Sequence, residues 1–197
     1  MNANKTSIGV IIDRSGSMSS LVADTIGGFN TFLSEQKALP GEADLTLVLF
    51  DNEYLVVHDG IKLADVPDLD RTTYVPRGST ALRDAIGRTI NVMRADISAK
   101  PEDKRPGKVI LLIITDGEEN ASKEYTADQI HKMLGEVQMN QGWEVTYFGA
   151  NQNTQVVGQT MNLDAASSIS YDSTSSGTRG AYTDMSARVT RSRTGGI

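Results

Sequence analysis

Ile8-Gly9-Val10-Ile11-Ile12-Asp13-Arg14-Ser15-Gly16-Ser17-Met18-Ser19 is the stretch that decides the fold. An apolar run, Ile8 to Ile12, breaks here into one carboxylate and two hydroxyls at alternate positions, Asp13, Ser15 and Ser17. Consecutive β-branched residues are typical of a buried parallel strand, and the polar residues begin where that strand should end. Gly16 allows a tight turn. The stretch therefore predicts a strand that delivers a polar loop to the edge of a sheet.

The loop supports two interpretations. An aspartate and two serines can surround a small hard cation, because Mg²⁺ prefers oxygen ligands at ~2.0–2.1 Å in an octahedral array. The loop contains no sulfur and no imidazole, which disfavours zinc. The alternative is a helix N-terminus, with Ser17 or Ser19 capping the following helix. Taken alone, the loop fits both.

Two later stretches favour the metal site. Gly78-Ser79-Thr80-Ala81-Leu82 places a hydroxyl in a loop before a helix, and a second apolar run, 109–114, ends at Thr115-Asp116-Gly117. Together the three pieces resemble the metal-ion-dependent adhesion site of the von Willebrand factor A (vWA) domain family, which reads Asp-x-Ser-x-Ser, then a threonine, then an aspartate. The resemblance covers about 7–172. The matching positions are Asp13, Ser15, Ser17, Thr80 and Asp116.

The resemblance implies a function as well as a fold. In vWA domains the hydroxyls tend to touch the cation directly, the aspartates act largely through water, and one coordination position stays open for a carboxylate of a partner protein. We therefore expect a protein-binding module that uses Mg²⁺ or Mn²⁺ and recognises an Asp or Glu side chain. Arg14 and Arg77 flank the hydroxyl loops, where they could assist an acidic partner or form ordinary salt bridges.

Composition indicates where such a module would work. The chain has no cysteine, and 1–6 lack the charged-then-apolar pattern of a signal peptide, so we expect a cytoplasmic protein. The longest apolar run, 109–114, is far shorter than the ~20 residues of a membrane span. In these features the chain resembles intracellular, single-domain vWA proteins of bacterial or phage type. That resemblance implies a partner such as an AAA-type ATPase or a stress-response assembly.

Length and charge limit the organisation of the chain and its partners. A chain of 197 residues fits one domain, 1–197, with its core at about 7–172 and a C-terminal helix and tail at 173–197. A net charge of −6 disfavours non-specific binding to nucleic acid or to an anionic membrane. The last 24 residues nevertheless contain four arginines and one aspartate. We expect a solvated helix face there rather than a basic arm, and Gly195-Gly196 should terminate that helix.

Hydrophobic periodicity predicts alternating strands and helices. The expected strands are 8–12, 45–50, 54–58, 109–114, 143–148 and 167–171, and the expected helices are 20–38, 82–97, 127–141, 156–161 and 178–193. Thr126 and Gln129 form a capping-box pattern, and Gly142 should end the same helix. Gly27 and Gly28 weaken the first helix, so we expect its backbone to pack closely against the sheet.

These elements predict an α/β fold: a doubly wound, mostly parallel six-stranded sheet with helices on both faces. The turn Asp51-Asn52-Glu53 is too short for a parallel crossover, so 54–58 should be an antiparallel edge strand. Ligands bind at the carboxyl ends of parallel strands in such sheets. Asp13, Asp116 and Thr80 should therefore converge at one edge, a prediction that does not depend on the family resemblance.

An enzyme is the competing interpretation. A metal-dependent phosphatase or hydrolase on a similar sheet could use Asp13 as its nucleophile. Haloacid-dehalogenase-type enzymes place a second aspartate two positions later, where this chain has Ser15, and no phosphate-binding glycine loop is present. We therefore expect a binding module and no catalytic residues. Glu118 and Glu119 follow Asp116 closely, and we expect them to be solvated loop residues rather than ligands.

Overall fold

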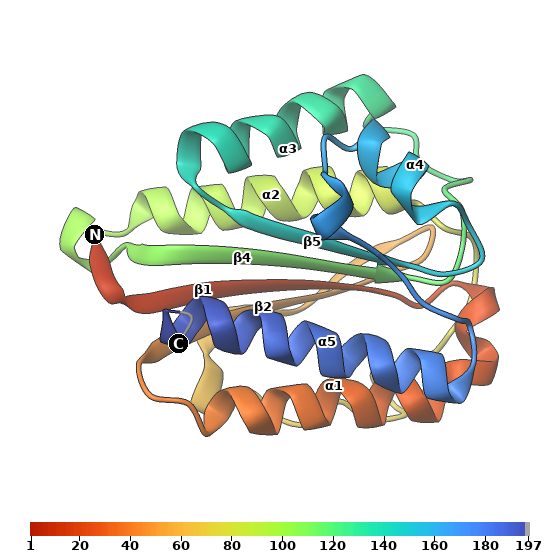
Figure 1. Ribbon diagram of the computed structural model, residues 1–197, viewed down its shortest axis with the longest axis horizontal. Coiled ribbons are helices and arrows are strands. Elements are labelled where there is room, and N and C mark those ends of the chain that lie inside the picture. The colour runs from red at the N-terminus through yellow and green to blue at the C-terminus, as the bar shows by residue number, and fades with distance from the viewer. Residues whose placement is uncertain (196–197) are drawn as a thin grey trace.

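The computed structural model describes residues 1–195. Strands and helices alternate along the chain, and short 3₁₀ turns lie between some of them (Figure 1). The strands are β1 (Asn2–Asp13), β2 (Glu42–Phe50), β3 (Tyr54–Lys62), β4 (Pro106–Thr115), β5 (Glu144–Gly149) and β6 (Ser168–Ser170). The helices are α1 (Val22–Lys37), α2 (Leu82–Ala99), α3 (Ala127–Gln141), α4 (Thr154–Thr160) and α5 (Ser175–Thr194).

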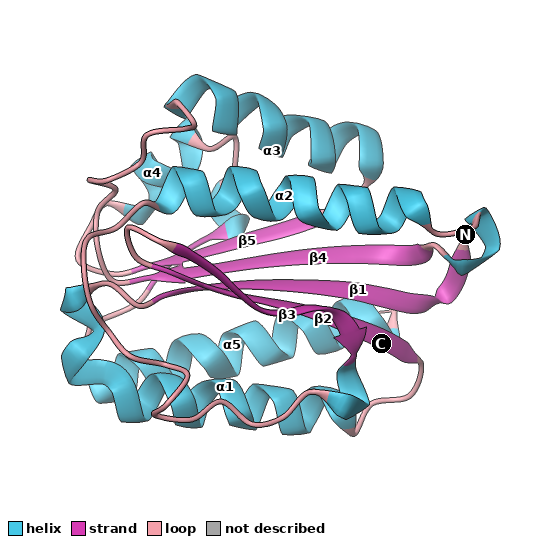
Figure 2. Ribbon diagram, turned by 180° about the vertical axis from the view of Figure 1, so that it is seen from behind, coloured by secondary structure: helices cyan, strands magenta, loops and turns pink. Residues whose placement is uncertain are grey.

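The six strands form one sheet in the order β3-β2-β1-β4-β5-β6. All neighbours are parallel except β2 and β3, which are antiparallel and joined by the turn at 51–53 (Figure 2). The predicted fold class is confirmed, including the antiparallel edge hairpin. The apolar strand β4 lies between β1 and β5, as its two buried faces require.

Helices cover both faces of the sheet (Figure 1). One face packs against α1 and α5, and the other packs against α2 and α3. Successive side chains of a strand point to opposite faces, so β1 and β4 contribute to both cores. Ile110 and Leu112 join the core beneath α1 and α5, whereas Leu111 and Ile113 join the core beneath α2 and α3. This sharing explains why consecutive residues are apolar in the buried parts of the central strands.

Several element boundaries differ from the sequence prediction. Strand β1 begins at Asn2, and β3 continues to Lys62. The first predicted helix begins as a 3₁₀ turn, Gly16–Leu21, before α1 starts at Val22. Neither serine caps it, because no side chain makes a capping hydrogen bond at either start. Polar strand ends carry no hydrophobic signal, so periodicity finds only the buried part of each strand.

The first helix packs closely against a different element from the one predicted. A Cβ atom on Gly28 would lie 2.4 Å from Cδ2 of Tyr182, which belongs to α5. Nothing lies within 4 Å of a Cβ atom built on Gly27. The prediction that both glycines serve contact with the sheet was therefore wrong. Gly28 instead lets two neighbouring helices approach each other.

Helix α5 accounts for the basic C-terminal residues. Tyr182, Met185 and Val189 are buried against α1 and the sheet, as its periodicity predicts. Arg193 donates to the carbonyl oxygen of Gln36 in α1, and Arg188 pairs with Asp184 one turn earlier. The basic residues thus belong to a helix and not to a free arm, as expected, but Arg188 and Arg193 are partly buried rather than fully solvated. Gly195 ends the helix with a φ of +82°, and Gly196 lies outside the described residues.

Helix α3 begins and ends as the sequence predicts. Thr126 and Gln129 form the reciprocal capping box, and Gly142 terminates the helix with a φ of +67°.

Across residues 1–195, no helix combines the length and the apolar character that crossing a bilayer would require.

The order of the strands determines where a ligand could bind. The chain moves outward from β1 to β2 and β3, then returns to the opposite side of β1 at β4. The strand order reverses between β1 and β4. The helices that follow these two strands cover opposite faces of the sheet, so the loops after β1 and β4 diverge and leave a crevice between them. Both loops lie at the same end of the sheet (Figure 1). Asp13 and Asp116 stand at the two sides of this crevice.

Candidate metal centre

Asp13 is the last residue of β1 and is fully buried. One carboxylate oxygen, Oδ1, accepts the backbone N–H of Ser15 at 2.6 Å, and the other, Oδ2, accepts the hydroxyl of Thr115. The Asp13 carbonyl accepts the hydroxyl of Tyr74 at 2.6 Å. Ser15 and Thr115 thus fix the carboxylate, and Tyr74 fixes the backbone of Asp13 at the end of the strand.

Burial makes the charge of Asp13 costly. The pKa of its carboxyl is raised from 3.8 to about 6, mainly because burial disfavours the charged form. Hydrogen bonds from Thr115 and Ser15 oppose this rise, and the nearby charge of Asp116 adds to it. A cation at this position would relieve both the desolvation and the repulsion.

A chain of hydrogen bonds joins the two loops. The hydroxyls of Ser15 and Ser17 are 3.1 Å apart, and Ser17 donates to Oδ1 of Asp116 at 2.5 Å. Oδ2 of Asp116 accepts the hydroxyl of Ser173 at 3.2 Å. The structure therefore brings Ser15 and Ser17 to Asp116, although about one hundred residues separate this pair from Asp116 in the sequence. Ser173, just before α5, is a site residue that the sequence did not reveal.

Thr80 completes the cluster. Its backbone N–H donates to the Asn120 side chain at 3.0 Å, and its carbonyl accepts the N–H groups of Asn120 and Ala121. These bonds tie the threonine loop to the loop after β4. Within residues 1–195 the Thr80 hydroxyl has no hydrogen-bond partner, so an oxygen lone pair stays available to a ligand.

Gly117 shows how closely the oxygens converge. A Cβ atom built on Gly117 would lie 3.3 Å from Oγ1 of Thr80, 3.5 Å from Oγ of Ser17 and 4.0 Å from Oδ2 of Asp13. Oxygens from three segments thus surround a space large enough for one atom, and the Cβ atom of any residue other than glycine would occupy it. A glycine here keeps that position open.

The donor set fits a hard divalent cation. Two carboxylates and three hydroxyls supply only oxygen, and the two negative charges balance a divalent charge. No group of three or more His, Cys, Asp or Glu side chains within the described chain could hold a metal by itself. A cation would therefore depend on the hydroxyls of Ser15, Ser17 and Thr80. Mg²⁺ and Mn²⁺ accept such ligands more readily than zinc does.

A second buried aspartate, Asp51, supports these loops. It is fully buried, and its Oδ2 lies 3.1 Å from Nε of Arg14 and 3.0 Å from Nε of Arg77. Its backbone carbonyl accepts the N–H of Ala81 at 2.9 Å, next to Thr80. Arg14 is itself buried, so of its two interpretations the structure supports the salt bridge and not contact with a partner. Arg77 is half exposed and also pairs with Glu53.

Backbone hydrogen bonds join the same loops directly. The N–H of Gly16 donates to the carbonyl of Gly78 at 3.2 Å, and the N–H of Arg77 donates to the carbonyl of Arg14 at 2.8 Å. Gly78 has a φ of +66°, and a Cβ atom there would lie 2.0 Å from the side-chain oxygen of Asn52. The serine and threonine loops are therefore locked to each other and to the β2–β3 turn.

The two glutamates after Asp116 differ from each other. Glu118 is exposed, as expected for a loop residue. Glu119 is partly buried, and its carboxylate accepts the backbone N–H groups of Arg83, Ala121 and Ser122. It anchors the start of α2 to the loop after β4, so its solvated interpretation was wrong. Glu118 and Glu119 are adjacent and identical, so the sequence does not indicate that one is exposed and the other is partly buried.

Comparison with known proteins identifies the fold. No protein-family model and no curated protein matches the sequence. The structure is similar to the vWF domain of the type V pili tip protein Mfa5 from Porphyromonas gingivalis, with 10% identity, a TM-score of 0.68, and coverage of 94% of this chain and 95% of that chain. It also resembles a von Willebrand factor type A protein from Catenulispora acidiphila, with 14% identity and a TM-score of 0.61.

A third similar structure is the pilus adhesin SpaC from Lactobacillus rhamnosus GG, with 13% identity and a TM-score of 0.66. The match to the second structure includes 93% of this chain but only 42% of the other chain, and the match to the third includes 96% of this chain but only 30% of the other. At these identities the likeness concerns the fold. The chain therefore has the von Willebrand factor A fold.

Proposed function

We propose that this protein is a metal-dependent protein-binding module. Mg²⁺ or Mn²⁺ would be held by Asp13, Ser15, Ser17, Thr80 and Asp116, and a partner's Asp or Glu side chain would complete its coordination. The convergence of three segments around the open position beside Gly117 carries this proposal. The hydroxyl ligands are neutral, so the cation would stay electrophilic enough to attract a further carboxylate.

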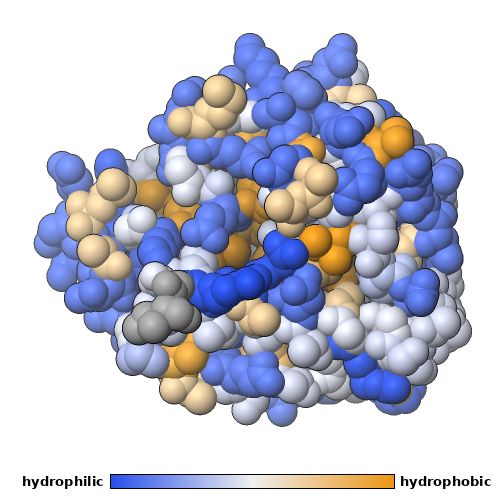
Figure 3. All heavy atoms as spheres, in the orientation of Figure 1, coloured by the Kyte–Doolittle hydropathy of each residue, from blue (hydrophilic) through white to orange (hydrophobic). Residues whose placement is uncertain are grey.

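The surface and the structural relatives support recognition through such a polar site. The face seen in Figure 3 is mainly hydrophilic, and its strongly apolar surface is limited to small patches among polar side chains. The similar structures include a protein named as a pilus tip protein and one named as a pilus adhesin. A cytoplasmic location and an AAA-type ATPase or stress-response partner remain predictions drawn from the sequence and its family resemblance.

Binding without catalysis is the second part of the proposal. Both carboxylate oxygens of Asp13 accept hydrogen bonds, from Ser15 and Thr115, which does not favour a nucleophile aimed at a substrate. Within residues 1–195, no lysine or histidine forms an ion pair with Asp13 or Asp116. His58 lies on β3 and His131 lies on α3. Within residues 1–195, therefore, no lysine or histidine is placed to act as general acid or base for a nucleophilic Asp13.

Thermal unfolding tests the metal site. The ligands come from three segments, so metal should bind the folded state almost exclusively. At a free metal concentration ~100 times the dissociation constant the gain is ~2.7 kcal/mol, which is roughly 5–10 °C in melting temperature for a chain of this size. We expect this shift when chelator is replaced by millimolar Mg²⁺ or Mn²⁺, and we expect Asp13→Ala to abolish it.

Asp103→Ala is the matched control, because Asp103 is an exposed aspartate in the 3₁₀ turn just before β4, at the opposite end of that strand. It should retain the full metal shift. An equal shift in the native protein and in Asp13→Ala would place the cation elsewhere and overturn the proposed site.

A further inference from the structure

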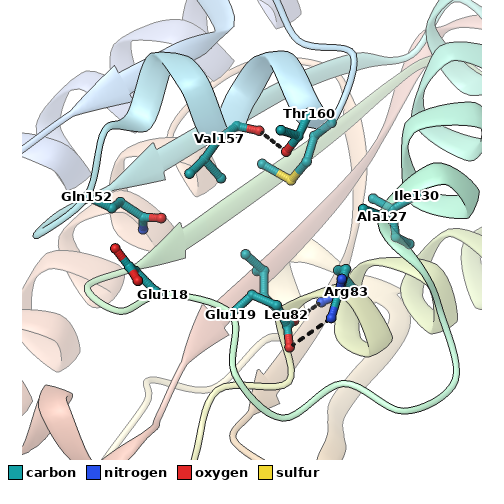
Figure 4. Close-up of a pocket in the computed structure, with 10 residues that line it drawn as sticks. Leu82, Arg83, Glu118, Glu119, Ala127, Ile130, Gln152, Val157 and Thr160 are labelled. Carbon is teal, nitrogen blue, oxygen red and sulfur yellow. Dashed lines mark hydrogen bonds and ion pairs between the residues drawn. The ribbon is translucent and has the colours of Figure 1, made fainter.

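A cavity of about 250 Å³ lies beside the candidate metal centre, between α2, α3 and α4 (Figure 4). Its lining is mostly apolar and includes Leu82, Ile130, Val157 and Met161. Pockets for drug-sized ligands usually occupy ~300–1,000 Å³, so this cavity is smaller than those. An apolar cavity of about 150 Å³ already holds benzene, so this one has room for an aliphatic side chain of a partner.

The cavity and the metal centre share their walls. Leu82 follows Thr80 by two residues, and Glu118 follows Asp116 by two residues. Two residues of extended chain span at most ~7 Å, so the cavity begins within one side-chain length of the metal ligands. Gln152 also lines the cavity and donates to the carbonyl of Gly117 at 3.1 Å, on the residue that faces the converging oxygens.

The rim of the cavity carries one unbalanced charge. Arg83 and Glu119 lie 3.6 Å apart and offset each other's charge. Glu118 lies on the opposite side of the cavity, beside Gln152 (Figure 4), and no other residue in 1–195 forms an ion pair with it. The rim is therefore negative next to the metal loop. It should repel a second carboxylate on the partner and accept neutral or basic neighbours.

We infer that the cavity receives an aliphatic side chain from the same partner segment whose carboxylate binds the metal. The partner would present an Asp or Glu, a Val, Leu, Ile or Met at a fixed short spacing, and no further acid at the rim. This inference rests on the proposed metal-dependent function and adds the specificity that a lone carboxylate cannot supply. Burying one such side chain is worth about a ten- to hundredfold gain in affinity.

Selection from a random-peptide phage library tests the inference. The library is bound to the native protein in millimolar Mg²⁺ and eluted with EDTA, and selected sequences are made as synthetic peptides. We expect them to share one acidic and one aliphatic residue at a constant spacing. Replacing the aliphatic residue with Ala should weaken binding about ten- to hundredfold without changing its dependence on Mg²⁺.

Variants of the protein locate this effect. Ala127 lines the cavity from the exposed first turn of α3, so Ala127→Trp should fill the cavity without disturbing the core. It should weaken peptide binding to the level of the Ala-substituted peptide, and the two changes together should cost no more than either alone. Met139→Trp is the control, because Met139 lies on α3, is 83% exposed and does not line the cavity. Glu118→Lys should remove the discrimination against a second acidic residue.

The possible failures are distinguishable. Selected peptides that share an acid but no aliphatic residue, or native affinity in Ala127→Trp, would overturn the cavity inference and leave the metal–carboxylate function standing. The absence of any EDTA-sensitive peptide would overturn the inference together with the proposed protein-binding function. The thermal shift with Mg²⁺ would then report separately on the metal site.

Discussion

Two buried aspartates near the same sheet edge, Asp13 and Asp51, lie in opposite electrostatic settings. Both are 0% exposed. Asp51 has permanent cationic partners, since Arg14 and Arg77 both lie about 3 Å from its Oδ2. Asp13 receives hydrogen bonds only from neutral groups, and burial raises its pKa to about 6. The fold thus supplies a built-in cation to one carboxylate and leaves the other available for a diffusible one.

The difference implies different responses to mutation. A charge paired within the fold is part of its stability, whereas a charge without a partner opposes folding until a ligand arrives. Natural proteins often accept such unfavourable features at functional sites. If Asp51 is structural and Asp13 is functional, replacing Asp51 should have the largest effect on stability.

Removing Asp51 should cost most. Asp51→Ala leaves the buried Arg14 without its ion-pair partner and removes an acceptor from the N–H of Glu53. Breaking a buried pair typically costs ~3–5 kcal/mol, which corresponds to roughly 6–20 °C in melting temperature here. A chemical-denaturation curve in chelator measures this loss, with Asp103→Ala as the control. A loss no larger than that of the control would mean that the Asp51 ion pairs contribute nothing to stability.

The response to pH should separate Asp13 from Asp51. A carboxyl whose pKa is about 6 in the folded state and 3.8 in the unfolded state favours folding most below pH 3.8, and this contribution is lost as pH rises to about 6. The shift of about 2 pKa units is worth about 3 kcal/mol. In chelator, the stability of the native protein relative to Asp13→Asn should therefore fall by most of that amount between pH 4 and pH 7.

Asparagine is the appropriate replacement because its side-chain oxygen can still accept the N–H of Ser15 and its amide can donate to Thr115. Denaturation curves for both proteins across this pH range give the comparison, and the falling difference should be offset when Mg²⁺ is present. A difference that stays flat with pH would show that Asp13 titrates normally and that its burial has no electrostatic cost.

Removing one neutral ligand should have the smallest effect. Thr80→Val keeps the shape of a buried side chain but lacks the hydroxyl, so metal affinity should fall by about tenfold, or ~1.4 kcal/mol. Thr80→Ser keeps the hydroxyl and should bind metal nearly as the native protein does. Calorimetric titration with Mn²⁺ measures both. Equal affinities in Thr80→Val and Thr80→Ser would remove Thr80 from the ligand set.

The sequence by itself determined the architecture, because local patterns carry it. Apolar runs of β-branched residues define the central strands, the three-residue turn at 51–53 forces an antiparallel hairpin, and the capping box at Thr126 marks the start of a helix. It also placed Asp13, Thr80 and Asp116 at one edge, since the carboxyl ends of parallel strands share an edge. None of these inferences needed a partner residue from a distant segment.

Tertiary structure decided everything that depends on such partners. Arg14 is buried and forms an ion pair with Asp51. Gly28 allows Tyr182 of α5 to approach α1 closely. Ser173 donates a hydrogen bond to Asp116 from a distant part of the chain. Each contact joins residues that are tens to more than one hundred positions apart. The sequence next to each residue gives no sign of its distant partner. Burial, and with it the raised pKa of Asp13, arises only when separate layers close over a side chain, so no single stretch of sequence contains it.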